Sequence, residues 1–456
     1  MVRAKAQHRA PIESNARLTF GSGAEPQGRW RRMDRRWGVD AVTAVAAIVA
    51  LSLVGCGSSG GSESADGGQT AEQVPQSAPP ESESEQDDAG VSTDGAWTWE
   101  RVGHRDEVFG DGATFAGPAM FDVVSTSNGF AAVGHRYDAD AQQDAAAFWF
   151  SSDGIDWELV AVDTPGSYAW SAAVGGDGTV AAVGSRNGEP AVWVSSSERS
   201  WELVDQDWNL TGAWAEMNDV ARTEDGFIAT GRASGPIPAM WTSQNGSVWT
   251  RLEPEAGSFR DSDVVLGGTS GGPGFILVGY NIEGSPDIPK VWTSPDGTSW
   301  DRVALSSGSG VVSDVALAGE RVIAVGSQRV DGPVSPRAGM VWLSSDGSSW
   351  SPGSDVDALT AEGREAEVTG VRTTTAGIVA VGSAGSQGGV WVSEDGASWK
   401  IAHPGLGSGW VQGYEPNHAV TAVADDGSTM VAVGHVTYDP DRDGRTAAVW
   451  VRDLQD

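Results

Sequence analysis

Pairs of tryptophans eight residues apart recur along this 456-residue chain and constrain its fold more than any other feature. Six pairs are complete, and a seventh begins at Trp450: Trp149/Trp157, Trp193/Trp201, Trp241/Trp249, Trp292/Trp300, Trp342/Trp350 and Trp391/Trp399. The best copies read Trp-x-Ser-x-Asp-Gly-x-x-Trp, and the flanking residues alternate in polarity. This pattern predicts two strands joined by a tight turn, because Gly takes positive φ at no steric cost. One hairpin cannot bury two tryptophans, so neighbouring copies are expected to stack.

The turn sequence varies little between copies. It reads Asp153-Gly154, Asp296-Gly297, Asp346-Gly347 and Asp395-Gly396 in four copies, Asn245-Gly246 in one, and Glu198-Arg199 in the divergent second copy. These turns resemble those of the Asp-box (bacterial neuraminidase repeat) propellers, which read Ser-x-Asp-x-Gly-x-x-Trp and are one residue longer. The resemblance covers residues 96–456 and implies a propeller fold. In that family the boxes are structural and lie away from the active site, so the resemblance implies no catalytic residue.

A second motif, an apolar strand ending in Gly, precedes each tryptophan hairpin. Its seven copies are 130–134, 180–184, 227–231, 275–279, 322–326, 378–382 and 430–434. Another short strand comes before each, as at Asp122-Val123-Val124. Each unit therefore has four antiparallel strands, a to d, on a period of about fifty residues, which is typical of a propeller blade. The sequence predicts an all-β, seven-bladed β-propeller over residues 96–456.

The two ends of this repeat array complement each other. The chain stops just after strand c of the last blade, Ala448 to Val451, and the array begins with an unpaired strand d, Trp97 to Val102. Pairing the two would close the ring and remove the edges that an open sheet exposes. We therefore expect the N-terminal strand to complete the last blade.

Residues 1–56 have the features of an export signal. A basic segment, Arg29 to Arg36, precedes an apolar run of 15 residues, Ala41 to Gly55, which is shorter than the roughly 20 residues that span a bilayer. The run ends in Leu-Val-Gly-Cys, which resembles a bacterial lipobox and implies cleavage before Cys56 and a lipid on its sulfur. The expectation is a lipoprotein on the extracytoplasmic face of the cell membrane. An uncleaved N-terminal anchor is the alternative, and translation starting at Met33 stays open.

Residues 57–95 carry nine acidic side chains and no basic or aromatic ones, so they are predicted to be a disordered, self-repelling tether. The formal net charge of the chain is −33, and residues 1–56 hold nine basic and four acidic side chains, which leaves −29 on residues 96–456. A domain this acidic repels nucleic acid, so nucleic acid is excluded as a partner. The expected partners are the membrane, through Cys56, and an envelope protein or glycan, and the domain is expected to be monomeric.

Aromatic side chains gather in the segments between strands b and c and between strands d and a, which share one face of a propeller. We predict a recognition surface there, because Tyr and Trp combine large contact area with a polar group. The alternative is that these rings fill gaps between blades. The predicted residues are Tyr137, Tyr168, Trp170, Trp208, Trp214, Tyr280, Trp410, Tyr414 and Tyr438.

Arg136, Arg186 and Arg232 follow strand b in three consecutive blades and join this predicted surface. Sialidases bind the substrate carboxylate with three arginines, so this placement suggests sialidase activity. No Arg-Ile-Pro segment or Tyr/Glu pair stands out, and fold does not carry function. The sequence therefore favours a ligand- or protein-binding module in the cell envelope, with sialidase-like or other glycoside hydrolysis as the alternative.

Two acidic patterns suggest cation sites, each with a plain structural alternative. Asp439, Asp441 and Asp443 form the start of a calcium loop, but Trp450 stands where the bidentate Glu belongs, so a solvated turn is the alternative. Strand a carries Asp122, Asp219, Asp263 and Asp314, with Ala172, Gly370 and Ala422 in the other blades. These carboxylates are expected either to ring a central channel or, more simply, to accept backbone N–H bonds. Calcium is thus a possible cofactor and no other is indicated.

Overall fold

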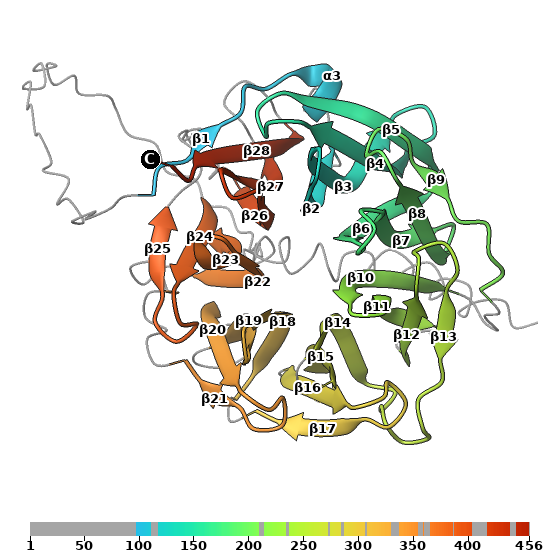
Figure 1. Cartoon of the computed structure of the whole chain (residues 1–456), viewed down its shortest axis with the longest axis vertical. Helices are drawn as coiled ribbons and strands as arrows, with labels where there is room; N and C mark the ends of the chain where they lie inside the picture. Colours follow the sequence, from blue (N-terminus) through green and yellow to red (C-terminus); the bar gives the residue numbers. More distant parts are fainter. Residues whose placement is uncertain are drawn as a thin grey trace, which may run out of the picture.

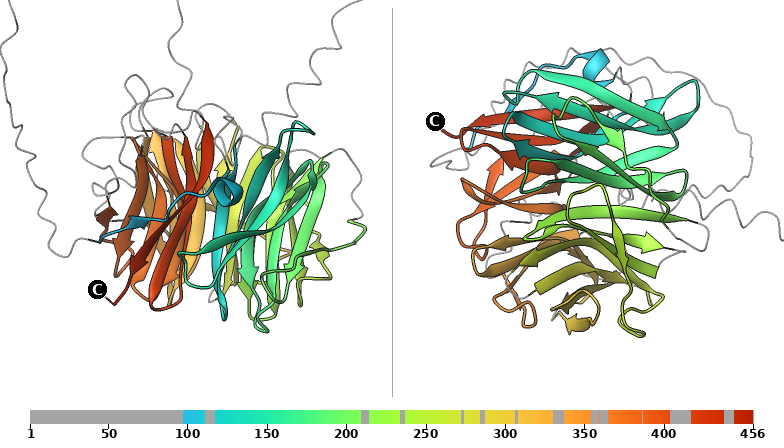
Figure 2. Two further views of the ribbon diagram at one scale, coloured as in Figure 1. Left: turned by 90° about the horizontal axis from the view of Figure 1, so that it is seen from above. Right: turned by 45° about the vertical axis from the view of Figure 1, so that its right-hand side comes forward.

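The computed structural model describes residues 97–110, 117–208, 214–233, 237–271, 274–283, 287–305, 308–329, 337–353, 359, 365–385, 387–403, 417–437 and 444–455. The predicted export signal with Cys56 and the predicted tether lie outside these ranges. Seven antiparallel four-stranded sheets surround a central axis (Figure 1), and their strands run roughly along that axis (Figure 2). The predicted seven-bladed β-propeller is confirmed. Within the described ranges, no helix has both the length and the hydropathy needed to cross a bilayer.

The first four blades follow one another along the chain, each running from the inner strand a to the outer strand d. Blade 1 holds β2 (Ala119–Thr126), β3 (Gly129–Asp138), β4 (Gln143–Ser151) and β5 (Trp157–Pro165). Blade 2 holds β6 (Ser167–Val174), β7 (Val180–Arg186), β8 (Glu189–Ser195) and β9 (Glu202–Leu203). Blade 3 holds β10 (Ala215–Thr223), β11 (Gly226–Ala233), β12 (Ile237–Ser243) and β13 (Thr250–Leu252). Blade 4 holds β14 (Asp263–Gly271), β15 (Gly274–Asn281), β16 (Ile288–Ser294) and β17 (Asp301–Ala304).

Blades 5 and 6 follow the same order, and the last blade combines both ends of the repeat array. Blade 5 holds β18 (Gly310–Ala318), β19 (Arg321–Arg329), β20 (Arg337–Ser344) and β21 (Ser351–Pro352). Blade 6 holds β22 (Ala366–Thr374), β23 (Gly377–Ala384), β24 (Gln387–Ser393) and β25 (Lys400–His403). Blade 7 holds β26 (Asn417–Asp425), β27 (Thr429–Thr437), β28 (Arg445–Asp453) and, as its outer strand, β1 (Glu100–Arg101). A single turn of helix, α3 (Asp106–Phe109), follows β1.

The predicted closure by the N-terminal strand is confirmed. Glu100 pairs with Val451, and the Val102 amide donates to the Val449 carbonyl at 2.9 Å. On the inner side of the same junction, the Thr421 hydroxyl donates to the Met120 carbonyl at 2.9 Å. The last and first blades are thus joined both at the rim and at the axis.

The tryptophan hairpins form by local hydrogen bonding, and blade 4 shows the pattern. The Ser294 hydroxyl oxygen accepts the Gly297 amide at 2.8 Å, and the Asp296 carboxylate accepts the Thr298 and Ser299 amides at 2.8 and 3.0 Å. The Trp300 indole N–H donates to the Gly297 carbonyl at 3.0 Å, while Gly297 has φ of 78°. The two amides are the main reason that the pKa of Asp296 falls to about 2. The turn is thus held by its own sequence.

Blade 2 keeps this turn without the Asp-Gly pair. Its second tryptophan, Trp201, donates to the Glu198 carbonyl at 3.1 Å, so Glu198 stands where the other blades have Gly. Glu198 has φ of 57°, a conformation that costs a non-Gly residue about 1 kcal/mol or more. Its side chain is buried and accepts an amide hydrogen bond from Asn128 of blade 1 at 3.1 Å. A contact between blades therefore replaces the missing local signal.

Large apolar residues from the connection before strand a pack on the first tryptophan of the following blade. Phe109 packs with Trp149, Phe259 lies 5.7 Å from Trp292 between ring centroids, and Leu359 is fully buried with Trp391. Trp208, predicted to bind a ligand, belongs to the same group, because it packs half-buried in the cluster of Trp241. These residues fill the wedge between blades, which is the structural alternative considered for the aromatic side chains.

Candidate functional site

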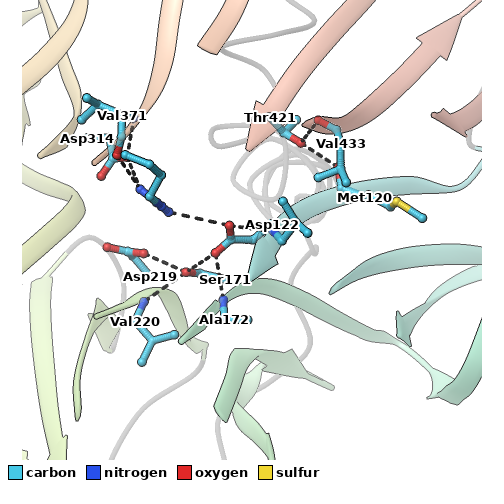
Figure 3. A network of polar contacts seen from close by, with 12 residues as sticks. Met120, Asp122, Ser171, Ala172, Asp219, Val220, Asp314, Val371, Thr421 and Val433 are labelled. Carbon is cyan, nitrogen blue, oxygen red and sulfur yellow. Dashed lines mark hydrogen bonds and ion pairs between the residues drawn. The ribbon is translucent and has the colours of Figure 1, made fainter. Parts of the chain in front are cut away.

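A girdle of side chains links the inner strands around the central channel (Figure 3). Every inner strand has a register irregularity at the same place, and the residues that follow it are Asp122, Ser171, Asp219, Gly267, Asp314, Gly370 and Ala422. Where the side chain of this residue has an oxygen, that oxygen accepts a hydrogen bond from a backbone amide of a neighbouring inner strand. These amides are Ala172 for Asp122 at 3.0 Å, Val220 for Ser171 at 3.3 Å, Gly268 for Asp219 at 3.0 Å and Val371 for Asp314 at 2.9 Å.

The predicted equivalence of the strand a residues is wrong in two blades. Asp263 begins β14 four residues before the equivalent position, which is Gly267, and it instead accepts hydrogen bonds from Arg260 and Asn281. In blade 2 the equivalent residue is Ser171, not Ala172. The irregularity inserts one residue before this position and thereby shifts the apparent spacing. The expectation that the carboxylates accept backbone N–H groups is confirmed for all four, because Asp263 accepts the Arg260 amide at 2.8 Å.

Arg372 completes the girdle from blade 6. Its guanidinium donates to Asp314 of blade 5 at 2.7 Å and lies 3.7 Å from Asp122 of blade 1. Burial raises the pKa of Asp314 to about 6 against the attraction of Arg372, and it raises the pKa of Asp122 for the same reason. The carboxylates already accept hydrogen bonds from amides, a hydroxyl and a guanidinium, so we interpret the girdle around the channel as structural. A binding site must be sought at its mouth.

The mouth lies at the end of the ring where strands b end and strands c begin, here called the b–c face. In blades 1 and 2 it carries a cluster of four rings. Tyr168 and Trp170 are parallel, with centroids 5.1 Å apart, and Phe121 lies 4.7 Å from Trp170 and 5.0 Å from His135. Trp170 is only 6% exposed. Its ring is therefore occupied by its neighbours and offers little surface to a ligand.

Polar contacts connect this ring cluster to blade 7. The Tyr168 hydroxyl donates to Asp144 at 2.7 Å, and Arg445 lies 2.8 Å from both the Gly117 carbonyl and the His135 imidazole. Burial, with the nearby Arg445 charge, holds the pKa of His135 well below its usual range. A neutral His135 can accept the Arg445 N–H. The ring cluster and its polar partners therefore stabilise the junction of blades 7, 1 and 2.

An open cleft lies on the b–c face between blades 4 and 5. Counting the open solvent at its mouth, it holds about 250 Å³. Ser309, Ser327 and Gln328 line it together with Asp287, Arg329 and Arg337. Gly310 and Val311 complete the lining, so most but not all of its residues are polar.

Arg329 and Arg337 are directly opposite each other on the paired strands β19 and β20. Facing like charges destabilise a sheet unless other groups compensate. Glu367 of blade 6 forms an ion pair with Arg337, and Glu365 accepts the Arg337 amide at 3.2 Å. Asp287 of blade 4 and these two glutamates of blade 6 thus surround the facing guanidinium groups of blade 5.

Two of these carboxyl groups have raised pKa values. Burial raises the pKa of Glu367 to about 7, against the attraction of Arg337 and with the repulsion of Glu365. Burial also raises the pKa of Asp287, against the attraction of Arg337 and Arg329. Near neutral pH, Glu367 therefore exists in both protonation states beside Arg337.

The remaining predicted residues of the b–c face do not form one carboxylate clamp. Arg136 donates to the Glu107 carbonyl at 3.3 Å, Arg186 to the Thr164 hydroxyl at 2.9 Å, and Arg232 pairs with Glu216 at 2.9 Å. Arg136 and Arg186 lie two residues after the glycine of strand b, but Arg232 lies one residue after it. Side chains alternate along a strand, so Arg232 points to the other side of its blade. Each arginine thus serves its own local partner.

The other predicted binding residues are four tyrosines, one tryptophan and the three aspartates of the predicted calcium loop. Tyr137 and Tyr280 lie at the ends of β3 and β15, half-buried. Trp410, Tyr414, Tyr438, Asp439, Asp441 and Asp443 lie outside the described residues. Among the residues that the structure describes, no three His, Cys, Asp or Glu side chains gather as metal ligands.

Sequence reasoning missed the cleft residues Asp287, Arg329 and Arg337 and the Arg337 partner Glu367. Arg329 and Arg337 come together only because of the strand register, and Glu367 reaches them from the next blade. The one available signal was that two arginines flank the b–c connection of blade 5 in an otherwise acidic domain.

No protein-family model and no curated protein matches the sequence. Among solved structures, a Dyadobacter fermentans protein of unknown function is similar at 13% identity and a TM-score of 0.44, covering 78% of this chain and 98% of that one. A Penicillium chrysogenum α-L-arabinanase has 13% identity and a TM-score of 0.41 over 63% and 93% of the two chains. A Fusarium graminearum α-L-arabinofuranosidase has 13% identity and a TM-score of 0.44 over 79% and 99%. No activity is transferred from similarities this low.

Proposed function

We propose that this protein is a monomeric, membrane-anchored propeller of the cell envelope that binds a neutral carbohydrate in the cleft between blades 4 and 5. The observation that carries the proposal is the facing pair Arg329 and Arg337 with Asp287 in one small polar cleft. Guanidinium and carboxylate groups are planar, and each offers two adjacent hydrogen-bonding positions. Neighbouring sugar hydroxyls, which both donate and accept, match such groups.

The charge balance supports a neutral ligand over an anionic one. Asp287, Glu365 and Glu367 surround the two guanidinium groups, so the cleft has no net positive charge when all three carboxyls are ionised. The formal charge of −29 on residues 96–456 also repels anions at long range. A protein partner is less well matched, because the cleft is small and polar.

The proposed location rests on the sequence. The lipobox-like segment ending in Cys56 and the acidic segment 57–95 support an anchored domain held away from the extracytoplasmic face of the membrane. Cys56→Ser should release the protein from membranes, with wild type as the control. Retention of this variant through its N-terminal segment would contradict lipid anchoring.

Binding is tested by titrating the purified full chain with neutral mono- and oligosaccharides in a calorimeter. Arg329→Ala should weaken binding about tenfold or more, since a hydrogen bond to a charged group contributes roughly 1.5–3 kcal/mol. Arg321→Ala is the matched control, because Arg321 begins the same strand β19 at its opposite end. Equal affinity of the two variants would contradict the assignment of the cleft.

Hydrolysis of a glycoside is the second candidate, and Glu367 favours it. A carboxyl group whose pKa is about 7 suits a general acid, and a second carboxyl, Asp287, lies beside the same Arg337. Aryl glycosides should remain uncleaved if the protein only binds. Cleavage that disappears in Glu367→Gln but persists in Arg321→Ala would establish the enzyme instead.

A further inference from the structure

The cleft between blades 4 and 5 lies at a place that two other blade junctions fill with a side chain. At the junction of blades 1 and 2, Tyr168 extends from strand a, and its hydroxyl donates to the Asp144 carboxylate at the start of strand c of blade 1 at 2.7 Å. At the junction of blades 5 and 6, Glu367 extends from strand a and forms an ion pair with Arg337 at the start of strand c of blade 5. A long polar side chain thus bridges each of these two junctions.

The strand register shows that the cleft occupies the equivalent position of its own junction. Tyr168 is paired with the residue that follows the glycine ending the apolar run of strand b, and Val311 has the same position in blade 5. Asp144 lies three residues before the strand c residue that is paired with this glycine, and so does Asp287 in blade 4. Val311 therefore corresponds to Tyr168, and Asp287 corresponds to Asp144.

The backbone of the two aspartates is also held in a similar way by the next blade. The Gly166 amide, just before strand a of blade 2, donates to the Asp144 carbonyl at 2.7 Å. The Gly310 amide, at the start of strand a of blade 5, donates to the Asp287 carbonyl at 2.8 Å. The two carboxyl groups therefore extend from backbone that is fixed against the same part of the neighbouring blade.

Strand a of blade 5 supplies no partner for the Asp287 carboxyl. Val311 is shorter than tyrosine and has no hydroxyl, so the space that Tyr168 occupies in blade 2 stays open as the cleft, which Val311 and Asp287 both line. Among the residues that the structure describes, no N–H or O–H group donates to this carboxyl, although the charges of Arg329 and Arg337 attract it. A ligand hydroxyl can therefore take the place of the Tyr168 hydroxyl.

The next position along strand a indicates which kind of ring fits this place. In blade 2 the Tyr168 ring is parallel to Trp170, with centroids 5.1 Å apart. Trp170 is the residue inserted at the strand irregularity, and in blade 5 the inserted residue is Ser313. A ring in the cleft therefore has no equivalent indole to stack on, so a saturated ring with several hydroxyls suits the cleft better than an aromatic ring. A pyranose has the ring size of the tyrosine side chain and carries hydroxyls around its edge.

We propose that Asp287 is the acceptor that determines specificity in the cleft, and that a hydroxyl of a pyranose ring donates to it as Tyr168 donates to Asp144. This inference rests on the proposed function and narrows it to six-membered sugar rings. Val311 keeps the place open, and the guanidinium groups of the cleft donate to other oxygens of the same ring.

The test titrates the full chain in a calorimeter with methyl pyranosides of glucose, galactose, mannose and xylose. Val311→Tyr gives blade 5 the side chain that blade 2 has at this position, so it should fill the cleft and weaken binding at least tenfold while the melting temperature is maintained. Val264→Tyr is the matched control, because Val264 has the same position in strand a of blade 4. It should bind the sugar as wild type does.

Asp287→Ala tests the hydrogen bond without filling the cleft, and it keeps the test available if the larger side chain at Val311 prevents folding. It should weaken pyranoside binding about tenfold or more, as for a lost hydrogen bond to a charged group. Monodeoxy analogues of the bound pyranoside then identify the donating hydroxyl. Its removal should weaken binding to wild type by a similar factor and leave binding to Asp287→Ala unchanged, because both changes delete the same contact. A deoxy series that affects both proteins equally would overturn the inference.

The outcomes separate this inference from the proposed function. Pyranoside binding that is weakened in Arg329→Ala but unchanged in Asp287→Ala and Val311→Tyr would overturn the Asp287 contact and leave the cleft as the binding site. Binding of methyl furanosides in preference to pyranosides would overturn the ring size and leave the function intact. Phenol is titrated beside the sugars, and binding of phenol without any sugar would overturn both proposals. If no sugar binds wild type, both proposals fail.

Discussion

Arg372 of blade 6 donates to Asp314 of blade 5 at 2.7 Å and also faces Asp122 of blade 1, so one guanidinium joins three blades across the channel. Burial by itself would lower the pKa of Arg372, but the negative charges of Asp314, Asp122 and Asp219 attract the guanidinium and together raise that pKa. The ring thus depends on a contact among blades that lie far apart in sequence.

Replacing this guanidinium should destabilise the ring in a pH-dependent way. Arg372→Met should cost about 2 kcal/mol at pH 7, less than the roughly 3–5 kcal/mol of a fully buried pair, because the Arg372 side chain is 38% exposed. The loss should shrink at pH 5, where Asp314 is largely protonated. Denaturant unfolding of this variant beside Arg321→Met measures both effects. An equal loss for both variants would contradict the stabilising role of the Arg372 ion pairs.

The free energy of unfolding should rise as the pH falls from 8 to 5. Burial raises the pKa of Asp314 to about 6 and that of Glu367 to about 7, so the folded state holds protons that the unfolded chain has released. These two groups therefore add about 3 kcal/mol of stability on acidification through this window. His135, whose pKa is held well below its ordinary value of 6.5, removes part of that gain in the lower half of the window, because the unfolded chain binds a proton there that the folded state does not. Below about pH 4 the trend should reverse, because protonation of Asp296 and Asp346, whose pKa is about 2, weakens the hydrogen bonds that their carboxylates accept in the turns. Urea unfolding at each pH tests this, and stability that falls between pH 8 and 5 would refute it.

The glycine of the tryptophan hairpin should tolerate no side chain. Gly297→Ala places a Cβ at φ of 78° and 2.9 Å from Leu252, so we expect a loss of about 1–2 kcal/mol. Gly308→Ala is the control, since a Cβ there meets no atom within 4 Å. Thermal melts compare the two. A loss at Gly308 as large as at Gly297 would contradict the argument.

The N-terminal strand should contribute far more stability than the segment before it. Deleting residues 97–102 removes the partner of β28 and exposes a sheet edge, whereas deleting 57–95 removes only the predicted tether. The first deletion should lower the melting temperature strongly and promote association. Equal melting temperatures would show that closure does not stabilise the ring.

Much of the fold follows from short-range chemistry that a sequence displays. Ser294, Asp296 and Gly297 form their turn by hydrogen bonds to their immediate neighbours, so the motif predicts the same hairpin wherever it recurs. Counting these hairpins predicts seven blades, and the unpaired strand at residues 97–102 predicts the closure. Such interactions act within a few residues and need no knowledge of the remaining chain.

Contacts between blades were decided only by the tertiary structure. The irregularity in β14 replaces the predicted Asp263 by Gly267 at the channel, and stacking against Tyr168 and Phe121 buries Trp170. The cleft depends on the register that places Arg329 opposite Arg337, and on Glu367 arriving from another blade. The amino-acid sequence alone determined the blades and how the ring closes. Side-chain positions between blades depend on how the twisted sheets pack, so only the assembled ring brought the site residues together.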